Sequence, residues 1–350
     1  MKKLPLKKRR RVAAGDRSPV RQRPLTEGQS LPWLIEPAAP GLDLVAWAGE
    51  HREELNRLVS QHGGILFRGF GVGSVEVFES LVRAVGGDLL RYRDRATPRS
   101  RVAGKVYTST DFPPDQGIEL HNENCYAHTF PMKVFFCCLQ PAQQGGETPI
   151  ADSRRVYDEL DPKIRQRFVD RGVTYLRNFL PDVGLDWRTT FDVTDREELE
   201  TFCRQARIDC EWRGEALRAR QTRPAVAVHP QTGEKVWFNQ ATAFHVSTLD
   251  PALGGELVAQ FGAEGVPKTT CFGDGAPLEE DDLSEIRRAF ARVEVSFPWQ
   301  QGDVLMLDNM LVAHGRRPFE GPRKVIVGMA EPMAADQIWS SQGGAFVVGD

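Results

Sequence analysis

The sequence lacks the features that mark membrane and secreted proteins. No apolar run is long enough to cross a bilayer, and the basic start leads into polar sequence instead of the apolar core of a signal peptide. The six cysteines include no C-x-x-C pair, which argues against a zinc knuckle and a disulfide framework. We therefore expect a cytoplasmic protein with reduced thiols and no membrane partner.

Net charge is also small, because 45 Lys and Arg residues stand against 48 Asp and Glu residues. A near-neutral chain has little general affinity for nucleic acid. The basic residues are unevenly spread, however, with ten Lys or Arg and one acid in residues 1–24. Such blocks are usually disordered and solvated, although KKRRR also matches nuclear-import signals and nucleic-acid-binding arms. We expect residues 1–25 to form a basic disordered tail, and we expect no nucleic-acid partner because no nucleic-acid-binding module follows.

The rest of the chain, residues 26–350, is predicted to form a single domain of the α+β class that is mainly β. Two amphipathic helices closed by glycines flank an apolar strand at residues 65–70, and strands predominate from Val106 onward. Residues from about 153 to 222 differ in character, because amphipathic helical stretches surround the strand candidate VTYLRNF. We interpret this segment as a helical insertion between two parts of a sheet.

His121 and Glu123 stand at alternate positions of the apolar, strand-like segment LHNENCY. Side chains two positions apart on a strand project to the same side, so the imidazole and the carboxylate would point together. Such a pair suits a metal clamp, an acid–base couple or a buried ion pair. The pair alone does not distinguish these three.

A metal clamp needs at least one further ligand. Non-haem iron(II) oxygenases use two histidines and one carboxylate on one face of an octahedron. His314 follows the apolar run VLMLDNMLVA, at an expected strand end that can reach the mouth of a barrel, and His245 in FNQATAFHV is its rival. Arg323 begins the next strand candidate, where a buried guanidinium needs an acidic partner that a bound dicarboxylate could supply.

Three motifs together carry a family resemblance: LHNENCY, QQGGETPIADSR and LDNMLVAHGRRPFEGPRK. The chain from about residue 65 to residue 329 resembles the TauD/TfdA group of iron(II)/2-oxoglutarate dioxygenases, and within it the SyrP-like branch, whose members often accompany nonribosomal peptide synthesis. The resemblance implies the clavaminate-synthase-like fold, a distorted double-stranded β-helix or jelly roll with flanking helices. It also implies an enzyme that uses Fe(II), 2-oxoglutarate and O2.

The same resemblance implies roles for five residues. His121, Glu123 and His314 would hold the iron. Thr148, in the GGET motif, would hydrogen-bond 2-oxoglutarate, and Arg323 would bind its distal carboxylate.

More than one arginine could bind the distal carboxylate of 2-oxoglutarate. In the taurine-dioxygenase branch this arginine lies slightly farther from the distal histidine, so Arg316 and Arg317 compete with Arg323. We favour Arg323 because strand alternation from it points Val325 and Val327 inward and turns Lys324 outward.

The resemblance further implies a reaction and a class of substrate. The expected reaction is hydroxylation of an unactivated C–H bond in an amino-acid-like small molecule of secondary metabolism, either free or tethered to a carrier protein. Desaturation or cyclisation at the same iron is an alternative, and so is a non-catalytic metal-binding jelly roll. Related halogenases carry Gly or Ala in place of the carboxylate ligand, so Glu123 argues against halogenation.

Substrate contacts are predicted at four residues. Arg177 lies in the insertion, which in this family is near the mouth of the site and could act as a lid. Phe238, Asn239 and His245 are candidates for cavity lining. The competing interpretations are a solvated strand cation for Arg177 and plain core packing for Phe238. No feature of the sequence predicts the oligomeric state.

Overall fold

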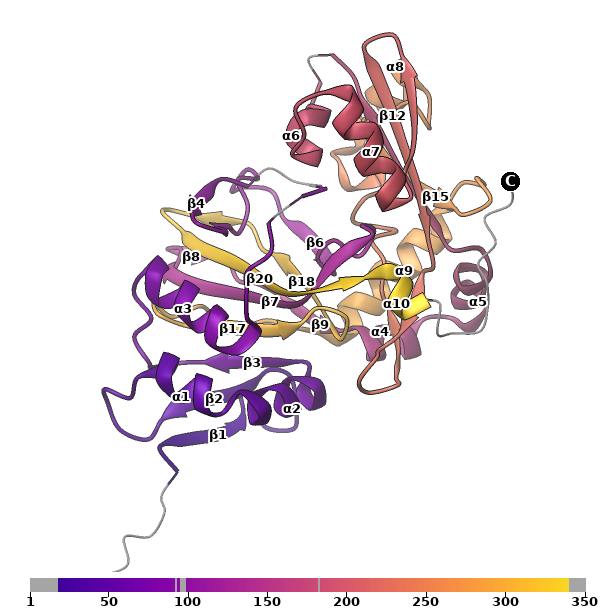
Figure 1. The fold of residues 1–350 in the computed structure, drawn as a ribbon. Coiled ribbons are helices and arrows are strands. Elements are labelled where there is room, and N and C mark those ends of the chain that lie inside the picture. The colour runs from indigo at the N-terminus through magenta and orange to yellow at the C-terminus, as the bar shows by residue number, and fades with distance from the viewer. Residues whose placement is uncertain (1–17, 92, 95–98, 182, 340–350) are drawn as a thin grey trace, which may run out of the picture.

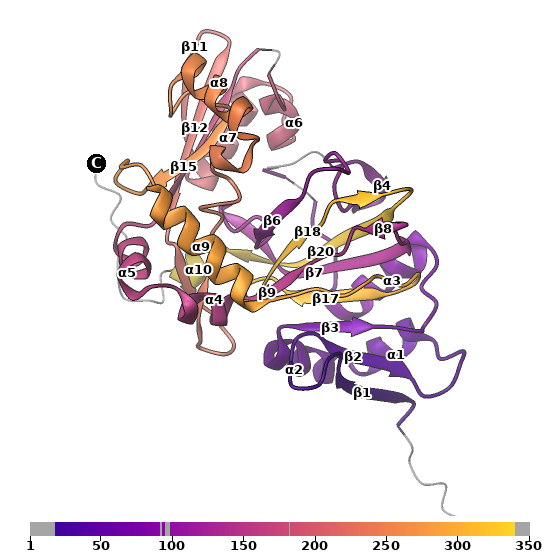
Figure 2. The same ribbon diagram turned by 180° about the vertical axis from the view of Figure 1, so that it is seen from behind.

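The computed structural model describes residues 18–91, 93–94, 99–181 and 183–339. The first seventeen residues of the expected basic tail therefore lie outside the described residues. Among the helices within these ranges, none has the length and apolar character needed to cross a bilayer. Figures 1 and 2 show the arrangement from opposite sides.

An eight-stranded sheet, which we call the major sheet, runs through the middle of the molecule (Figure 1). Its spatial order is β1-β2-β3-β17-β7-β20-β5-β4, and its neighbours pair antiparallel except for the parallel pair of β2 and β3. The strands are β1 (Val20–Pro24), β2 (Trp33–Pro37), β3 (Gly64–Phe67), β4 (Arg101–Ala103), β5 (Val106–Thr108), β7 (Thr129–Gln140), β17 (Val304–Asp308) and β20 (Lys324–Ala334).

The central strands of the major sheet are apolar on both faces, which explains their continuous hydrophobic runs. In β7, Phe135 and Cys137 face the helical layer, whereas Val134 and Phe136 face the second sheet. The same alternation holds along β17 and β20. Each of these strands therefore contributes to two cores at once.

The first strand corrects the predicted extent of the tail. Residues 20–24, which the charge pattern assigns to the disordered segment, form β1 and pair with β2 at the sheet edge. Val20 is buried against the helical layer, while Arg21 and Arg23 lie at the exposed side. Basic side chains are common on edge strands because they discourage further strand pairing, so positive charge here does not indicate disorder.

Three helices cover one face of the major sheet: α1 (Leu44–Glu50), α2 (Arg52–His62) and α3 (Val75–Gly86). The first two were expected as one helix, but the chain breaks at His51. The ring of His51 stacks on Trp47 and hydrogen-bonds the Trp47 carbonyl, and thereby ends α1. The expected glycine stops are confirmed at Gly63 and Gly87, which both have positive φ.

A four-stranded sheet, the minor sheet, faces the other side of the major sheet and completes the jelly roll. Its order is β16-β9-β18-β6, and Ile150 and Val312 from it share one core with the major sheet. The strands are β16 (Glu294–Val295), β9 (Ile150–Asp152), β18 (Val312–Arg316) and β6 (Ile118–His121). Helices α4 (Ser153–Glu159) and α9 (Glu280–Val293) cover its outer face (Figure 2). The mainly β jelly roll with flanking helices is confirmed.

The expected insertion forms a separate sheet with order β11-β12-β10-β15, seen at the top of Figure 1. Its strands are β10 (Val173–Phe179), β11 (Asp209–Arg213), β12 (Ala216–Arg223) and β15 (Lys268–Phe272). Helices α5 (Pro162–Arg171), α6 (Trp187–Phe191) and α7 (Arg196–Ala206) belong to the same segment. Because β15 supplies the fourth strand, this sheet uses chain well beyond the predicted boundary at residue 222.

Short elements complete the chain. They are β8 (Gln144–Gly145), β13 (Val226–Val228), β14 (Lys235–Trp237), β19 (Phe319–Glu320), the 3-10 helix η1 (Val246–Thr248), α8 (Pro251–Phe261) and α10 (Ala335–Trp339). The pairing of β8 with β19 matters for the site, because it joins the GGET motif to the segment that precedes Arg323.

Candidate active site

Three side chains from distant parts of the chain converge on the inner face of the minor sheet. His121 ends β6, Glu123 follows in a turn, and His314 lies at the centre of β18, paired with His121 on one side and Ile150 on the other. One possible ligand atom from each of His121, Glu123 and His314 lies within 4.8 Å of the others. The two imidazole centroids are 4.6 Å apart. This spacing can hold a single metal ion.

The local structure of the triad differs from the prediction in two respects. The strand expected through LHNENCY ends at His121, and Glu123 comes to the same side because the chain turns there, with Asn124 at φ +52°. His314 lies in mid-strand and not at a strand end, because the apolar run is split into β17 and β18. Asp308 accepts hydrogen bonds from the backbone N–H groups of Met310 and Leu311, which forms the turn between them.

Electrostatics leave His121 and Glu123 in the protonation states that a metal needs. Burial and the neighbouring His314 lower the pKa of His121 to about 4, so this imidazole is neutral near pH 7. Its Nδ1 donates to the Glu119 carbonyl at 2.8 Å, which leaves Nε2 as the ligand atom. Burial favours the neutral acid at Glu123, but Arg99 and His314 outweigh burial and hold the pKa of that carboxyl below its usual range.

His314 supplies the clearest sign that the site accommodates a metal. The residue is buried, and neither ring nitrogen has a hydrogen-bond partner among the described residues. Its Nε2 lies 3.6 Å from Glu123 Oε2, too far for a hydrogen bond, and buried ring nitrogens without hydrogen bonds are costly unless a ligand satisfies them. Two neutral imidazoles and one carboxylate form the donor set of non-haem Fe(II) oxygenases, so the residues fit that ion. The alternative of a His121–Glu123 ion pair is not supported, because Glu123 pairs with Arg99 at 2.6 Å and His121 is neutral.

Asn309 ties the two ligand-bearing segments together. Its Oδ1 accepts from the Glu123 backbone N–H at 2.7 Å, and its Nδ2 donates to the carbonyls of Glu123 and Pro131 at 2.9 and 2.8 Å. Asn122 adds a bond from its Nδ2 to the Asn309 carbonyl at 2.7 Å. The residues Asp308 and Asn309 before His314 therefore have distinct structural roles. Asp308 forms the turn between β17 and β18, and Asn309 holds the Glu123 backbone against that turn.

We expect Asn309→Ala to weaken Fe(II) binding by about 10- to 100-fold, as loss of an outer-shell partner usually does, and to lower the free energy of unfolding by roughly 2–3 kcal/mol. Anaerobic Fe(II) titration and urea unfolding measure the two effects. Asn309→Asp is the informative companion, because it keeps the acceptor for Glu123 but cannot donate to both carbonyls. Full rescue by Asp would contradict the proposed arrangement.

A small cavity joins the triad to the residues predicted to bind the co-substrate. Thr148 and Arg323 both line it, together with His121 and His314. The indole Nε1 of Trp299 donates to Thr148 Oγ1 at 3.1 Å. Since that oxygen already accepts a hydrogen bond, its own hydroxyl hydrogen is available to donate to a carboxylate.

The structure separates the three candidate arginines. Arg317 is exposed and forms an ion pair with Glu294 on the outer face. Arg316 lines the cavity, but its guanidinium donates to the carbonyls of Phe112, Pro113 and Gln116. These contacts leave Arg323 as the arginine best placed to receive a second carboxylate.

The guanidinium of Arg323 is held in place and stays charged. Its Nε donates to the Gly146 carbonyl at 2.9 Å and its Nη1 to Ser109 Oγ at 3.3 Å. Burial, with a smaller contribution from Arg316, lowers its pKa to about 10. It therefore remains a cation at neutral pH. Lys324 is exposed and Val325 and Val327 are buried, as the alternation predicts.

The structure explains why the GGET motif has glycine at positions 145 and 146. A Cβ on Gly145 would lie 2.2 Å from the Pro318 carbonyl oxygen, and one on Gly146 would lie 3.0 Å from both Cδ and Nε of Arg323. Both residues also have positive φ. The motif thus allows the Arg323 side chain to lie directly against the turn.

We expect Gly146→Ala to raise KM for 2-oxoglutarate by about 10-fold, because displacing a bound guanidinium by even an ångström is costly, while Fe(II) affinity stays unchanged. Gly233→Ala is the matched control, since Gly233 has φ +72° and no heavy atom within 4 Å of an added Cβ. It carries the same backbone strain without touching Arg323. Equal KM values in the two variants would show that strain alone is responsible.

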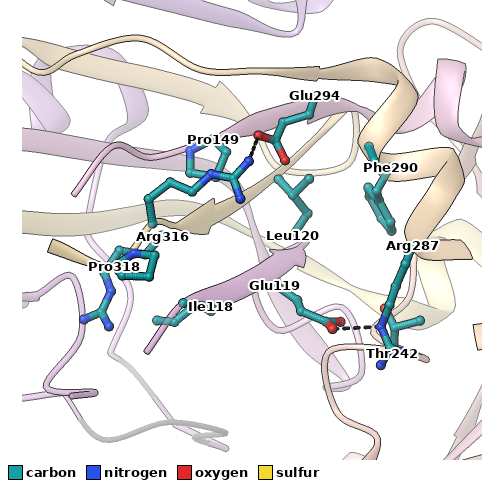
Figure 3. Close-up of a pocket in the computed structure, with 13 residues that line it drawn as sticks. Ile118, Glu119, Leu120, Pro149, Thr242, Arg287, Phe290, Glu294, Arg316 and Pro318 are labelled. Carbon is teal, nitrogen blue, oxygen red and sulfur yellow. Dashed lines mark hydrogen bonds and ion pairs between the residues drawn. The ribbon is translucent and has the colours of Figure 1, made fainter. Parts of the chain in front are cut away.

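A second cavity of about 300 Å³ opens on the outer side of β6, against α9 (Figure 3). Leu120, Pro149 and Phe290 give it an apolar floor, and the ion pair between Glu119 and Arg287 at 2.9 Å closes one end. It shares two lining residues, Ile118 and Arg316, with the triad cavity. The two hollows are therefore neighbours on either side of the edge strand.

None of the four predicted substrate residues lines either cavity. Arg177 is buried in an ion pair with Asp94 at 2.6 Å and lies over the ring of Phe191. It is therefore neither a solvated cation nor a residue of the described cavities.

The other three predicted substrate residues also make contacts within the protein. Phe238 packs edge-on against Phe130 in the core. Asn239 bonds the backbone of Ala225 and Ala241. His245 caps η1 through Ser247, away from the triad cavity. Their polar or apolar character reflects local packing.

Sequence reasoning missed several residues that line the triad cavity, among them Arg99 and Phe136, which contact the proposed ligands. Arg99 precedes β4 in a loop without periodicity, so no pattern indicates that it contacts Glu123. Phe136, whose ring packs edge-on against His314 at 5.0 Å, sits within the run VFFCC, where neighbouring residues are equally apolar. Strand alternation counted from a known inward residue would have identified Phe136 alone.

The chain is similar in sequence to one protein family and to characterised relatives. The sequence model of the family described as "Taurine catabolism dioxygenase TauD, TfdA family" matches residues 21–330. The dapdiamide synthesis protein DdaC of Enterobacter agglomerans is 37% identical over 312 residues, covering 89% of this chain and 94% of the relative. The clavaminate synthase-like protein At3g21360 of Arabidopsis thaliana is 32% identical over 333 residues, covering 90% and 98%.

Solved structures agree at the level of the fold. PvcB from Pseudomonas aeruginosa superposes with a TM-score of 0.54 at 16% identity, covering 91% of this chain and 93% of that one. A further PvcB structure is described as that of an Fe, alpha-ketoglutarate dependent oxygenase from an isonitrile synthetic pathway. At this identity the likeness supports the jelly-roll fold alone.

Proposed function

The chain belongs to the TauD/TfdA dioxygenase family, and from this premise we propose that it hydroxylates an unactivated C–H bond of an amino-acid-like small molecule in secondary metabolism. As a 2-oxoglutarate-dependent oxygenase it uses Fe(II), 2-oxoglutarate and O2. The name of DdaC ties that relative to the synthesis of dapdiamide, which supports a role in secondary metabolism. The observation that carries the proposal is the convergence of His121, Glu123 and His314.

We assign the iron ligands to His121 Nε2, a Glu123 carboxylate oxygen and one ring nitrogen of His314. The chemistry that the bound iron supplies is the coupled conversion of 2-oxoglutarate and O2 to succinate and carbon dioxide with oxidation of the substrate. The protein's own contribution is to hold the three ligands at fixed positions and to exclude bulk water. Asn309 and the Glu119 carbonyl orient two of the ligands.

The co-substrate contacts are assigned to Arg323 and Thr148. Arg323 would bind the distal carboxylate of 2-oxoglutarate with two parallel hydrogen bonds, which its planar fork favours. Thr148 would donate its hydroxyl hydrogen to the same molecule, with Trp299 fixing the orientation. A non-catalytic metal site would not need residues that bind a dicarboxylate. The presence of Thr148 and Arg323 therefore favours catalysis over metal storage.

The test uses the full chain loaded anaerobically with Fe(II) and 2-oxoglutarate and then exposed to O2 with free amino acids, dipeptides or carrier-tethered aminoacyl thioesters. We expect stoichiometric succinate and a product heavier by one oxygen atom. A product lighter by two hydrogen atoms would indicate that the enzyme catalyses desaturation instead of hydroxylation. Absence of succinate under every condition would contradict the proposal.

A further inference from the structure

Asn122 stands between the proposed ligands His121 and Glu123 and is fully buried. Its side chain donates to the Asn309 carbonyl at 2.7 Å. Its backbone carbonyl accepts a hydrogen bond from Nε2 of Gln240 at 2.8 Å. Because Asn122 is covalently joined to both ligands, the orientation of its peptide groups constrains where the imidazole and the carboxylate can lie.

Gln240 lies in the loop after β14 and is anchored to the insertion sheet. The residue is buried, and its backbone N–H donates to the Tyr175 hydroxyl at 2.9 Å. Tyr175 is itself buried in β10, and its ring packs against Tyr126, three residues after Glu123, with the centroids 5.6 Å apart. A continuous path of contacts therefore runs from the insertion sheet through Gln240 to the chain between two ligands.

The hydrogen bond from Gln240 is the shorter of two that the Asn122 carbonyl accepts among the described residues. The other comes from the Cys125 N–H within the turn and measures 3.4 Å, beyond the usual range for such a bond. Loss of the Gln240 donor would leave a buried carbonyl with this weak bond alone, which is costly and frees the peptide group to rotate.

We infer that Gln240 is a positioning residue for the iron site and that Tyr175 acts on the site through Gln240. This rests on the proposed function and adds to it that the insertion sheet supports the iron-binding turn. Neither side chain lines the triad cavity, so each acts through Asn122 and not on the co-substrate. Outer contacts of this kind orient metal ligands, and their loss typically weakens metal affinity by about 10- to 100-fold.

The variants each remove one link of this path. Gln240→Met keeps the length of the side chain and removes the donor, and Tyr175→Phe keeps the ring and removes the hydroxyl. The double variant carries both changes. Gln221→Met is the matched control, because Gln221 is a buried glutamine opposite Tyr175 on β12 whose amide has no hydrogen-bond partner among the described residues.

The experiment compares metal binding with folding in the full chain. Anaerobic titration gives the Fe(II) affinity, the visible absorption of the Co(II)-loaded protein reports the coordination geometry, and urea unfolding of the metal-free protein gives its stability. The wild type is measured first. A wild type that binds no Fe(II) would overturn the proposed function and this inference with it, whereas variants that bind like the wild type would overturn the inference alone.

We expect Gln240→Met to weaken Fe(II) binding by at least about 10-fold and to change the Co(II) absorption. Tyr175→Phe should weaken Fe(II) binding by about 5-fold, as loss of one neutral hydrogen bond implies. The double variant should bind no more weakly than Gln240→Met, because Tyr175 acts through Gln240. Gln221→Met should match the wild type.

Three results would overturn the inference. In the first, Gln240→Met lowers the free energy of unfolding but leaves Fe(II) affinity and the Co(II) absorption unchanged, as a purely structural role implies. In the second, the two single losses multiply in the double variant. In the third, Gln221→Met weakens metal binding as much as Gln240→Met does.

Discussion

The His314→Ala variant is expected to lose Fe(II) affinity by more than about 100-fold, beyond the loss that an outer-shell change causes, and to release no measurable succinate from 2-oxoglutarate. The reason is geometric. His314 is fixed in mid-strand between β9 and β6, and His121 is the only other histidine among the described residues that line the cavity. His121 and Glu123 alone leave a two-ligand site. Anaerobic Fe(II) titration and succinate quantification measure the two losses.

His245→Ala is the matched control, because His245 was the rival third ligand on sequence grounds and caps η1 outside the triad cavity. It should bind Fe(II) like the wild type. The metal-free His314→Ala protein should also remain folded, since the removed ring has no hydrogen-bond partner among the described residues to lose. Wild-type Fe(II) affinity in folded His314→Ala protein would refute the ligand assignment.

The triad was predicted from the family resemblance that three short motifs carry, and the structure brings the three side chains together. The alternation of His121 and Glu123 pointed to one side, which is correct, although the cause is a turn after His121 and not a continuous strand. The preference for Arg323 followed from alternation, which points Val325 and Val327 inward and Lys324 outward, as the structure has them. Local patterns were informative here although the local structure differs, since His121 ends a strand, Glu123 lies in a turn and His314 lies in mid-strand.

Other features depend on long-range packing that no local pattern encodes. Arg177 was predicted to contact the substrate because the insertion lies near the mouth of the site in this family, yet its partner, Asp94, lies in a loop far away in the chain. Arg99 likewise reaches Glu123 from an aperiodic loop. The fourth strand of the insertion sheet, β15, joins from residues 268–272, because antiparallel pairing with β10 is set by tertiary contacts and not by sequence adjacency.

The second large effect is expected at Arg323. Arg323→Ala should raise KM for 2-oxoglutarate by about 100-fold, or about 2.8 kcal/mol, which lies within the roughly 2–5 kcal/mol that truncating one partner of a buried charge pair costs. Fe(II) binding without 2-oxoglutarate should be unaffected, because Arg323 contacts Gly146 and Ser109 and none of the three proposed ligands. Steady-state succinate assays at varied 2-oxoglutarate, beside Fe(II) titrations, separate the two quantities.

Arg317→Ala provides the comparison for that measurement, since Arg317 is an exposed cation on the outer face, paired with Glu294. Arg323→Lys discriminates further: a lysine restores the charge but not the planar fork, so its KM should lie between those of the wild type and the alanine variant. If Arg316 were the true anchor, Arg323→Ala would leave KM near the wild-type value. That outcome would place the distal carboxylate against a guanidinium already surrounded by the carbonyls of Phe112, Pro113 and Gln116, and those bonds would have to break on binding. The cost of breaking them is the physical reason to expect the large effect at Arg323.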